Sequence, residues 1–232
     1  MKIGIIGALQ EEIKIFTKII NPFKTKIIQD YQINIGKFKK SNIFLIQSGI
    51  GKVSASISTM LLINLYQPDI IINSGSAGSL SASLKIGDII LPKNICYYDV
   101  DLTNFGYSYG QIPEYPKQFI INKKIYKYFY EDYFNNTLTL KQGLIVSGDS
   151  FINNNSDINI LKNKFPTAIA VDMESAAIAQ VCYKFDIPLI VVKSISDLSN
   201  ENAIFNFKQN ISIASLHSFR FVKYILENLI KI

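Results

Sequence analysis

Three acidic residues follow apolar segments whose composition is typical of buried strands. They are Glu12 after residues 2–8, Glu174 after residues 169–171, and Asp197 after residues 189–196. Two carboxyl groups with different protonation states can divide acid and base catalysis between them. Glu12 and Glu174 also have a simpler interpretation, because an acid in the first turn of a helix interacts favourably with the helix dipole.

Asp197 ends an apolar segment, so we expect its side chain to be partly removed from water. Burial disfavours the charged form and raises the pKa of an aspartic acid toward neutrality, as a general acid requires. The alternative is that Asp197 caps the helix that follows it.

Two glycine-rich segments, SGIGK at 48–52 and SGSAG at 74–78, form a second group of candidate residues. Neither has the phosphate-loop pattern or the full dinucleotide-binding pattern. Residues 75–78 directly follow an apolar strand, so we expect their main-chain amides and the Ser76 hydroxyl to face a ligand. A plain tight turn is the alternative.

Alternating strand and helix patterns predict the elements that position these residues. Strands are expected at 2–8, 26–31, 33–38, 43–47, 70–73, 88–91, 142–146, 169–171 and 189–196, and helices at 10–20, 49–65, 116–131, 157–164, 173–185 and 207–230. The order predicts an α/β fold, a three-layer αβα sandwich on a mixed, mainly parallel central sheet, with residues 1–232 as a single domain. Ligands bind such sheets beyond the carboxyl ends of the strands, where the candidate residues lie.

Composition excludes several other classes of protein. Of 232 residues, 48% are hydrophobic and 18% charged, which predicts a folded chain. The apolar segments end short of the ~18 residues that span a bilayer, and the start lacks a signal-peptide cleavage site. We therefore expect a cytoplasmic protein with no membrane partner. Cys96 and Cys182 are predicted to be free thiols, and no Cys/His cluster has the spacing of a zinc site.

The net charge of +6 raises the possibility of a nucleic-acid partner. However, Arg220 is the only arginine, and the lysines are scattered along the chain instead of forming a dense stripe interleaved with aromatic residues. We expect no nucleic-acid partner.

Short motifs along the chain carry a resemblance to a known family. They are MKIGIIGA at 1–8 with Glu11 and Glu12, SGIGK at 48–52, NSGSAG at 73–78, FGY at 105–107, GLIVSGD at 143–149, VDME at 171–174 and SISD at 194–197. Their combination and order resemble those of the bacterial 5'-methylthioadenosine/S-adenosylhomocysteine nucleosidases. The resemblance covers the chain from residue 1 to beyond residue 197.

The resemblance implies cleavage by water of the bond between adenine and a 5'-thio-substituted ribose, without metal or cofactor, in the nucleoside phosphorylase/hydrolase fold. Asp197, oriented by Ser196, would protonate adenine N7, and Glu12 would take a proton from the attacking water. An inverting glycosidase divides its acid and base between two carboxyl groups in the same way.

The resemblance also implies a set of substrate contacts and a homodimer. Met173 and Glu174 would hold the ribose, and Ser76 and Lys193 would lie near the water. Gly78 would also bind substrate, and the main chain of Phe151 and Ile152 would face the base. The thioalkyl tail would meet Ile50 and Phe207, together with Phe105, Tyr107 and Pro113 of the other subunit. The chain departs from the family at Lys193, where arginine is usual and which lacks the planar fork of a guanidinium, and more mildly at Leu9 and Asp172.

Three alternatives stay open. A purine nucleoside phosphorylase shares the fold but uses arginine side chains to bind phosphate, and the only arginine of this chain is Arg220. Futalosine hydrolysis is an alternative at the level of the substrate. A catalytically inactive nucleoside-binding protein would keep the pocket, although the presence of all three acids speaks against it.

Overall fold

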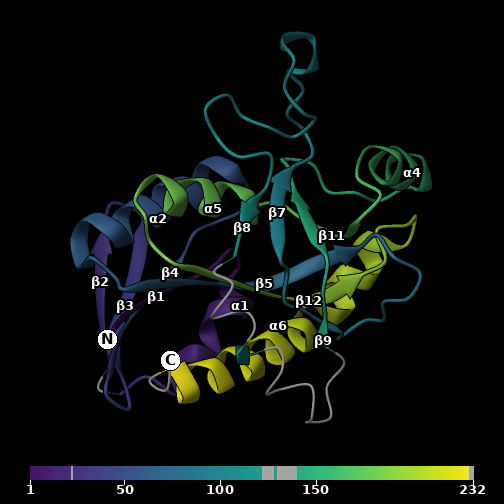
Figure 1. Cartoon of the computed structure of the whole chain (residues 1–232). Coiled ribbons are helices and arrows are strands. Elements are labelled where there is room, and N and C mark those ends of the chain that lie inside the picture. Colours follow the sequence, from purple (N-terminus) through teal and green to yellow (C-terminus); the bar gives the residue numbers. More distant parts are fainter. Residues whose placement is uncertain (22, 122–127, 130–139, 230–232) are drawn as a thin grey trace.

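The computed structural model describes residues 1–21, 23–121, 128–129 and 140–229. Within these residues the strands form one sheet (Figure 1). The strands are β1 (Lys2–Gly7), β2 (Phe23–Ile28), β3 (Tyr31–Phe38), β4 (Ser41–Gln47), β5 (Ile70–Ser79), β6 (Ile89–Ile90), β7 (Asn94–Tyr97), β8 (Phe119–Ile120), β9 (Leu140–Lys141), β10 (Leu144–Ser147), β11 (Ala168–Asp172) and β12 (Leu189–Asp197). The helices are α1 (Gln10–Lys14), α2 (Lys52–Tyr66), α4 (Asn155–Lys164), α5 (Ser175–Lys184) and α6 (Ala203–Asn228), with 3-10 turns η1 (Phe16–Lys18) and η2 (Thr103–Phe105).

The sheet is mixed, with a parallel centre. Its main path runs β2-β3-β4-β1-β5-β11-β10-β7-β8, and β12 pairs with β5 and β6. Strand β1 is parallel to β4 and β5, and β12 is parallel to β5. Strands β2 and β3 form an antiparallel edge, and β11 is antiparallel to β5. The pattern agrees with the predicted mixed, mainly parallel sheet.

Helices cover both faces of this sheet. Helix α2 packs against α5 on one face, whereas α6 packs against β5 and β12 on the other and also contacts α1 (Figure 1). The central strands have apolar residues on both faces, such as Ile71 and Ile72 in β5 and Val191 and Val192 in β12, and all four are fully buried. Each such side chain contributes roughly 1.5–3 kcal/mol by leaving water. The three-layer α/β prediction is confirmed.

The predicted helix at 10–20 is divided into α1 and the 3-10 turn η1, and two other segments form a different type of element from the one predicted. Residues 75–78, expected to form a loop, continue strand β5 as far as Ser79. The glycines stay extended because β12 pairs with them in register, Lys193 opposite Gly75 and Ser194 opposite Ser76. Residues 116–121, expected to begin a helix, instead include β8, which pairs with β7; residues 122–127, 130 and 131 of that expected helix lie outside the described residues.

Both cysteines are buried free thiols, as predicted. Burial raises the pKa of Cys96 to about 12, so its thiol stays protonated and unreactive. Among the described helices, none combines the length and the apolar character needed to cross a membrane.

Candidate active site

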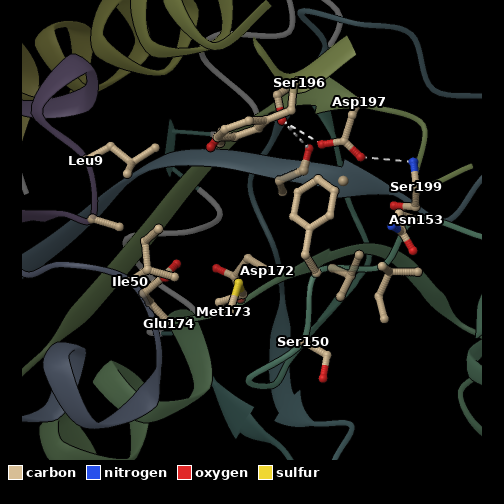
Figure 2. Close-up of a pocket in the computed structure, with 18 of the residues that line it drawn as sticks. Leu9, Ile50, Ser150, Asn153, Asp172, Met173, Glu174, Ser196, Asp197 and Ser199 are labelled. Atoms are coloured by element: carbon tan, nitrogen blue, oxygen red, sulfur yellow. Dashed lines mark hydrogen bonds between the residues drawn. The ribbon is translucent and has the colours of Figure 1, made fainter. Parts of the chain in front are cut away.

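A cavity of about 350 Å³ opens where the carboxyl ends of β1, β5, β11 and β12 meet. This size suits a small organic ligand. Figure 2 draws 18 of the residues that line it. The full lining comprises Ala8, Leu9, Glu12, Ile50, Ser76, Ala77, Gly78, Ser150, Phe151, Ile152, Asn153, Val171, Asp172, Met173, Glu174, Ser196, Asp197, Ser199, Ile204 and Phe207. The two acids to which catalysis was assigned from the sequence, Glu12 and Asp197, therefore share one cavity.

Glu12 is held by groups from two different strands. Its Oε2 accepts hydrogen bonds from the main-chain N–H groups of Ala8 (2.8 Å) and Leu9 (3.2 Å), just beyond β1. Its Oε1 accepts hydrogen bonds from the N–H (2.8 Å) and the hydroxyl (2.9 Å) of Ser76 in β5. The bond to Leu9 caps α1, so the helix-terminus interpretation is correct in part. The bonds to Ser76 go beyond capping and fix the carboxylate in the cavity wall.

The approach of Glu12 to β5 requires a glycine at position 75. A Cβ atom on Gly75 would lie 2.7 Å from Glu12 Oε1 and 2.8 Å from Cδ. Any larger residue would therefore push the carboxylate away from Ser76.

Asp197 is the last residue of β12, and its side chain is buried. Ser196 donates a hydrogen bond from its hydroxyl to Oδ2 (2.9 Å), and the main-chain N–H of Ser199 donates to Oδ1 (2.9 Å). Burial raises the pKa of Asp197, and these two hydrogen bonds oppose the rise only in part. The alternative role as a helix cap is excluded, because α6 begins at Ala203 with Asn202 as its N-cap residue.

Glu174 lies at the start of α5, on the other side of the cavity from Asp197 in Figure 2. Its Oε1 accepts a hydrogen bond from the main-chain N–H of Gly51 (3.0 Å). Burial raises the pKa of Glu174 to about 7, and Lys193 and the Gly51 N–H limit the rise. The side chain makes no capping hydrogen bond to α5, so its orientation serves the cavity instead of the helix.

Lys193 lies behind this wall and is not among the residues that line the described cavity. Its Nζ is 2.9 Å from Asp172 Oδ2 and 3.8 Å from Glu174 Oε2. Burial disfavours the ammonium cation, but the carboxylates of Asp172, Glu174 and Glu12 outweigh burial and raise the pKa of Lys193. Lys193 therefore stays charged beside the two acids.

Asp172 anchors Lys193 through further buried hydrogen bonds. It accepts one from the Ser147 hydroxyl (2.5 Å) and others from the main-chain N–H and the hydroxyl of Ser175. The Ser175 hydroxyl also lies 2.9 Å from Asn73 Oδ1 in β5. This network links β5, β10, β11 and β12 directly beneath the cavity.

Charged groups link two loops at the rim of the cavity, the loop that carries Ile50 and the loop that carries Phe151. The main-chain N–H of Lys52, next to the loop that carries Ile50, donates to Asp149 Oδ1 (2.8 Å). The Lys52 ammonium lies 2.6 Å from Asp99 Oδ2, and the Asp149 N–H donates to the same oxygen (3.0 Å). Ile50 and Phe151 are thus held on the same rim, where the Phe151 ring meets Phe207 edge to face at 5.8 Å.

Most of the substrate contacts expected from the resemblance are brought together. The residues that line the cavity as expected are Ser76, Gly78, Phe151, Ile152, Met173, Glu174, Ser196, Ile50 and Phe207. Phe105, Tyr107 and Pro113 do not line it, and the Phe105 side chain is 78% exposed. The resemblance had placed these three residues in the site of a second subunit.

Ser199 and Asn153 also line the cavity, and they are not among the site residues predicted from the sequence. Ser199 had a usable signal, because an aspartate often accepts a hydrogen bond from the N–H two residues further along, and Asp197 does so. Asn153 had no comparable signal, since it lies in a run of three asparagines.

The αβα sandwich, with two buried acids in one cavity at the strand ends, is consistent with the phosphorylase superfamily. The family model of that superfamily matches residues 2–227. The chain is 63% identical over 230 residues to a 5'-methylthioadenosine/S-adenosylhomocysteine nucleosidase of Buchnera aphidicola subsp. Acyrthosiphon pisum (strain Tuc7), covering 99% of both chains. It therefore belongs to the 5'-methylthioadenosine/S-adenosylhomocysteine nucleosidase family.

Two solved structures share the fold over nearly the whole chain. The nucleosidase of Neisseria meningitidis in complex with methylthio-immucillin-A superimposes with a TM-score of 0.95 at 32% identity, covering 98% of this chain and 99% of that one. The futalosine hydrolase of Helicobacter pylori superimposes with a TM-score of 0.94 at 31% identity, with 98% of each chain covered.

Proposed function

We propose that this chain hydrolyses the N-glycosidic bond of 5'-methylthioadenosine, S-adenosylhomocysteine and 5'-deoxyadenosine, releasing adenine and the 5'-substituted ribose. The observation that carries the proposal is the presence of Glu12 and Asp197 in one cavity, with Asp197 buried so that its pKa is raised. The reaction requires no metal or cofactor.

Asp197 acts as the general acid at adenine N7. The raised pKa keeps its proton available, and transfer to N7 turns adenine into a neutral leaving group. Ser196 and the Ser199 N–H hold the two carboxyl oxygens and so fix the direction of transfer.

Glu12 acts as the base on water. Bond cleavage leaves positive charge on the ribosyl group, and a water activated by Glu12 attacks the anomeric carbon on the face opposite adenine. Hydrogen bonds from Ala8, Leu9 and Ser76 orient the carboxylate before the substrate arrives, so no rearrangement is needed.

Glu174 and Met173 bind the ribose, with the Glu174 carboxylate accepting hydrogen bonds from the sugar hydroxyls. The proposal gives Lys193 an indirect role, because its charge 3.8 Å from Glu174 Oε2 favours the ionised form of that acid. A lysine supplies this positive charge without the planar fork of an arginine. The main chain of Gly78, Phe151 and Ile152 faces the base.

We also propose that two copies form a homodimer in which Phe105, Tyr107 and Pro113 of one subunit complete the thioalkyl pocket of the other beside Ile50 and Phe207. Exposed apolar side chains on α2, on α5 and at the C-cap of α5 support a contact between copies. They include Val53 (70% exposed), Ile57 (45%), Tyr183 (56%) and Phe185 (43%). Apolar surface of this kind is typical of subunit interfaces.

A single nucleosidase domain in the cytoplasm completes the proposal. One sheet runs through the described residues, and the free thiols of Cys96 and Cys182 are the form that a reducing compartment maintains.

Product analysis with purified protein tests the proposed reaction. Methylthioadenosine, S-adenosylhomocysteine, 5'-deoxyadenosine, inosine and futalosine are each incubated with and without phosphate, and released base and sugar are measured. We expect adenine from the 5'-substituted adenosines at a rate independent of phosphate. A rate that rises with phosphate and yields a sugar 1-phosphate would identify a phosphorylase, and binding without turnover would identify an inactive nucleoside-binding protein.

A further inference from the structure

The hydroxyl of Ser199 is fully buried, yet among the described residues it has no hydrogen-bond partner. Leaving a buried hydroxyl unpaired is unfavourable, because it gives up its hydrogen bonds to water and gains none. The oxygens of Tyr66, Ser194 and Ser215 share this property within the described chain, but Ser199 is the one of these four residues that lines the cavity. Its unpaired hydroxyl is therefore available to a ligand.

The backbone holds Ser199 in an unusual conformation. Its φ of +55° lies in the left-handed region, which serine rarely adopts. The turn is closed by the hydrogen bond from the Ser199 N–H to Asp197 Oδ1. Strained residues of this kind persist where the surrounding structure fixes them, and they cluster at binding and catalytic sites. The turn fixes Ser199 next to the proposed general acid.

Gly78 shows where the two side chains meet. A Cβ atom on Gly78 would clash with the Ser199 hydroxyl and would lie 3.0 Å from Asp197 Oδ1. The hydroxyl and the carboxyl oxygen therefore both lie over the main chain of Gly78. Figure 2 shows Ser199 and Asp197 at the same end of the cavity, away from Glu174.

We propose that the Ser199 hydroxyl is a base-recognition group that accepts a hydrogen bond from the 6-amino group of the substrate's adenine. This inference rests on the proposed function, which puts adenine N7 at Asp197. On a purine, the 6-amino group is the next polar group along the edge that carries N7. A hydroxyl can accept a hydrogen bond from an amino group, and the contact would satisfy the oxygen left unpaired in the free protein.

The test compares methylthioadenosine with the same nucleoside lacking the 6-amino group, 5'-methylthio-purine riboside. Ser199→Ala should lower kcat/KM for methylthioadenosine about tenfold, because it leaves the buried amino group without this acceptor. The kcat/KM of the deaminated analogue should change less than about twofold. Ser199→Gly should reproduce both results, since glycine adopts the positive φ without strain.

Ser215→Ala is the matched control. Ser215 is also a buried serine whose hydroxyl has no partner among the described residues, but it lies in α6 outside the cavity lining. Its substitution should leave both substrates unaffected. The melting temperature of ligand-free Ser199→Ala should match or exceed that of the wild type, because an unpaired hydroxyl has been removed.

Two results would overturn the proposal. An equal loss with both substrates would mean that Ser199 acts through Asp197 or the turn, and no loss with either would mean that it does not touch the base. Failure of the proposed function is distinguishable, because the wild type would then release base from neither nucleoside in the absence of phosphate. In that case the affinities of free adenine and free purine, measured by calorimetry on the same variants, decide the same question.

Discussion

The ammonium nitrogen of Lys193 lies 2.9 Å from an oxygen of Asp172, and both side chains are buried. Glu174 lies 3.8 Å from the same nitrogen, so one cation serves two acids. The charge state of a residue in the cavity wall therefore depends on a lysine that does not line the cavity.

Lys193→Met should destabilise the protein strongly. It leaves Asp172 and Glu174 as buried acids without their cation, and breaking such a pair costs about 3–5 kcal/mol. Urea denaturation measures the loss. The double variant Asp172→Asn with Lys193→Met should recover part of it, whereas Lys162→Met at an exposed position should change stability by less than about 0.5 kcal/mol. Equal destabilisation by the single and double variants would show that the ion pair is not the cause.

Asp197→Asn should lower kcat about 100- to 10,000-fold, because an amide N–H is far too weak an acid to protonate adenine. Glu12→Gln should cause a loss of similar size by removing the acceptor of the water's proton. Steady-state release of adenine measures both. Asp186→Asn and Glu11→Gln are controls at exposed positions and should retain full activity. Normal turnover by Asp197→Asn would show that the acid has been assigned to the wrong residue.

Gly75→Ala should impair catalysis more than folding. The added methyl group collides with the end of the Glu12 side chain, which can move aside, so the fold survives while the base leaves its place. We expect kcat to fall at least about tenfold, because misplacement of a catalytic group by about an ångström is costly. Thermal denaturation checks that the fold persists, and unchanged kcat would contradict the proposed position of the base.

Stability should depend on pH through Glu174. Its pKa rises from 4.5 to about 7 on folding, so folding favours the protonated form. This contribution is fully present below pH 4.5 and is lost as the pH rises through about 7. The stability of the wild type relative to Glu174→Gln should therefore fall across this range. A constant or rising difference in urea denaturation would refute the shift.

Phe105→Ala should raise the KM for methylthioadenosine while the protein stays dimeric. The side chain is 78% exposed in one subunit, and the proposed dimer buries it against the thioalkyl tail of the substrate bound in the other. Kinetics and sedimentation measure the two properties. Ile27→Ala, on β2 and 71% exposed, is the control for loss of an exposed apolar side chain. A monomer in solution would contradict the shared site.

The sequence could predict the three acids because each one follows a local apolar segment that alone identifies a buried strand. It could not predict that residues 75–78 stay in β5, because their strand conformation depends on pairing with β12 more than a hundred residues away. Glycine-rich segments favour turns locally, and tertiary pairing overrides that preference.

For the same reason, contacts between segments that are distant in the chain could not be predicted from the sequence. The meeting of Lys193 with Asp172 depends on how β12 and β11 lie on either side of β5, which no local pattern encodes. The role of Ser199 depends on one residue with a left-handed backbone. In both cases the sequence gives the residue type, but it does not predict which residues lie next to it in three dimensions.

In the pairing of β12 with β5, Lys193 lies opposite Gly75 and Ser194 lies opposite Ser76. Enzymatic turnover therefore depends on the correct alignment of these two strands. A slip of one residue would turn every side chain of β12 to the opposite face, pulling Lys193 and Asp197 out of place together. A misaligned chain could keep its helices and much of its compactness and still be inert. Recovery of activity after denaturation would therefore report correct alignment of the sheet, which a measurement of helix content would miss.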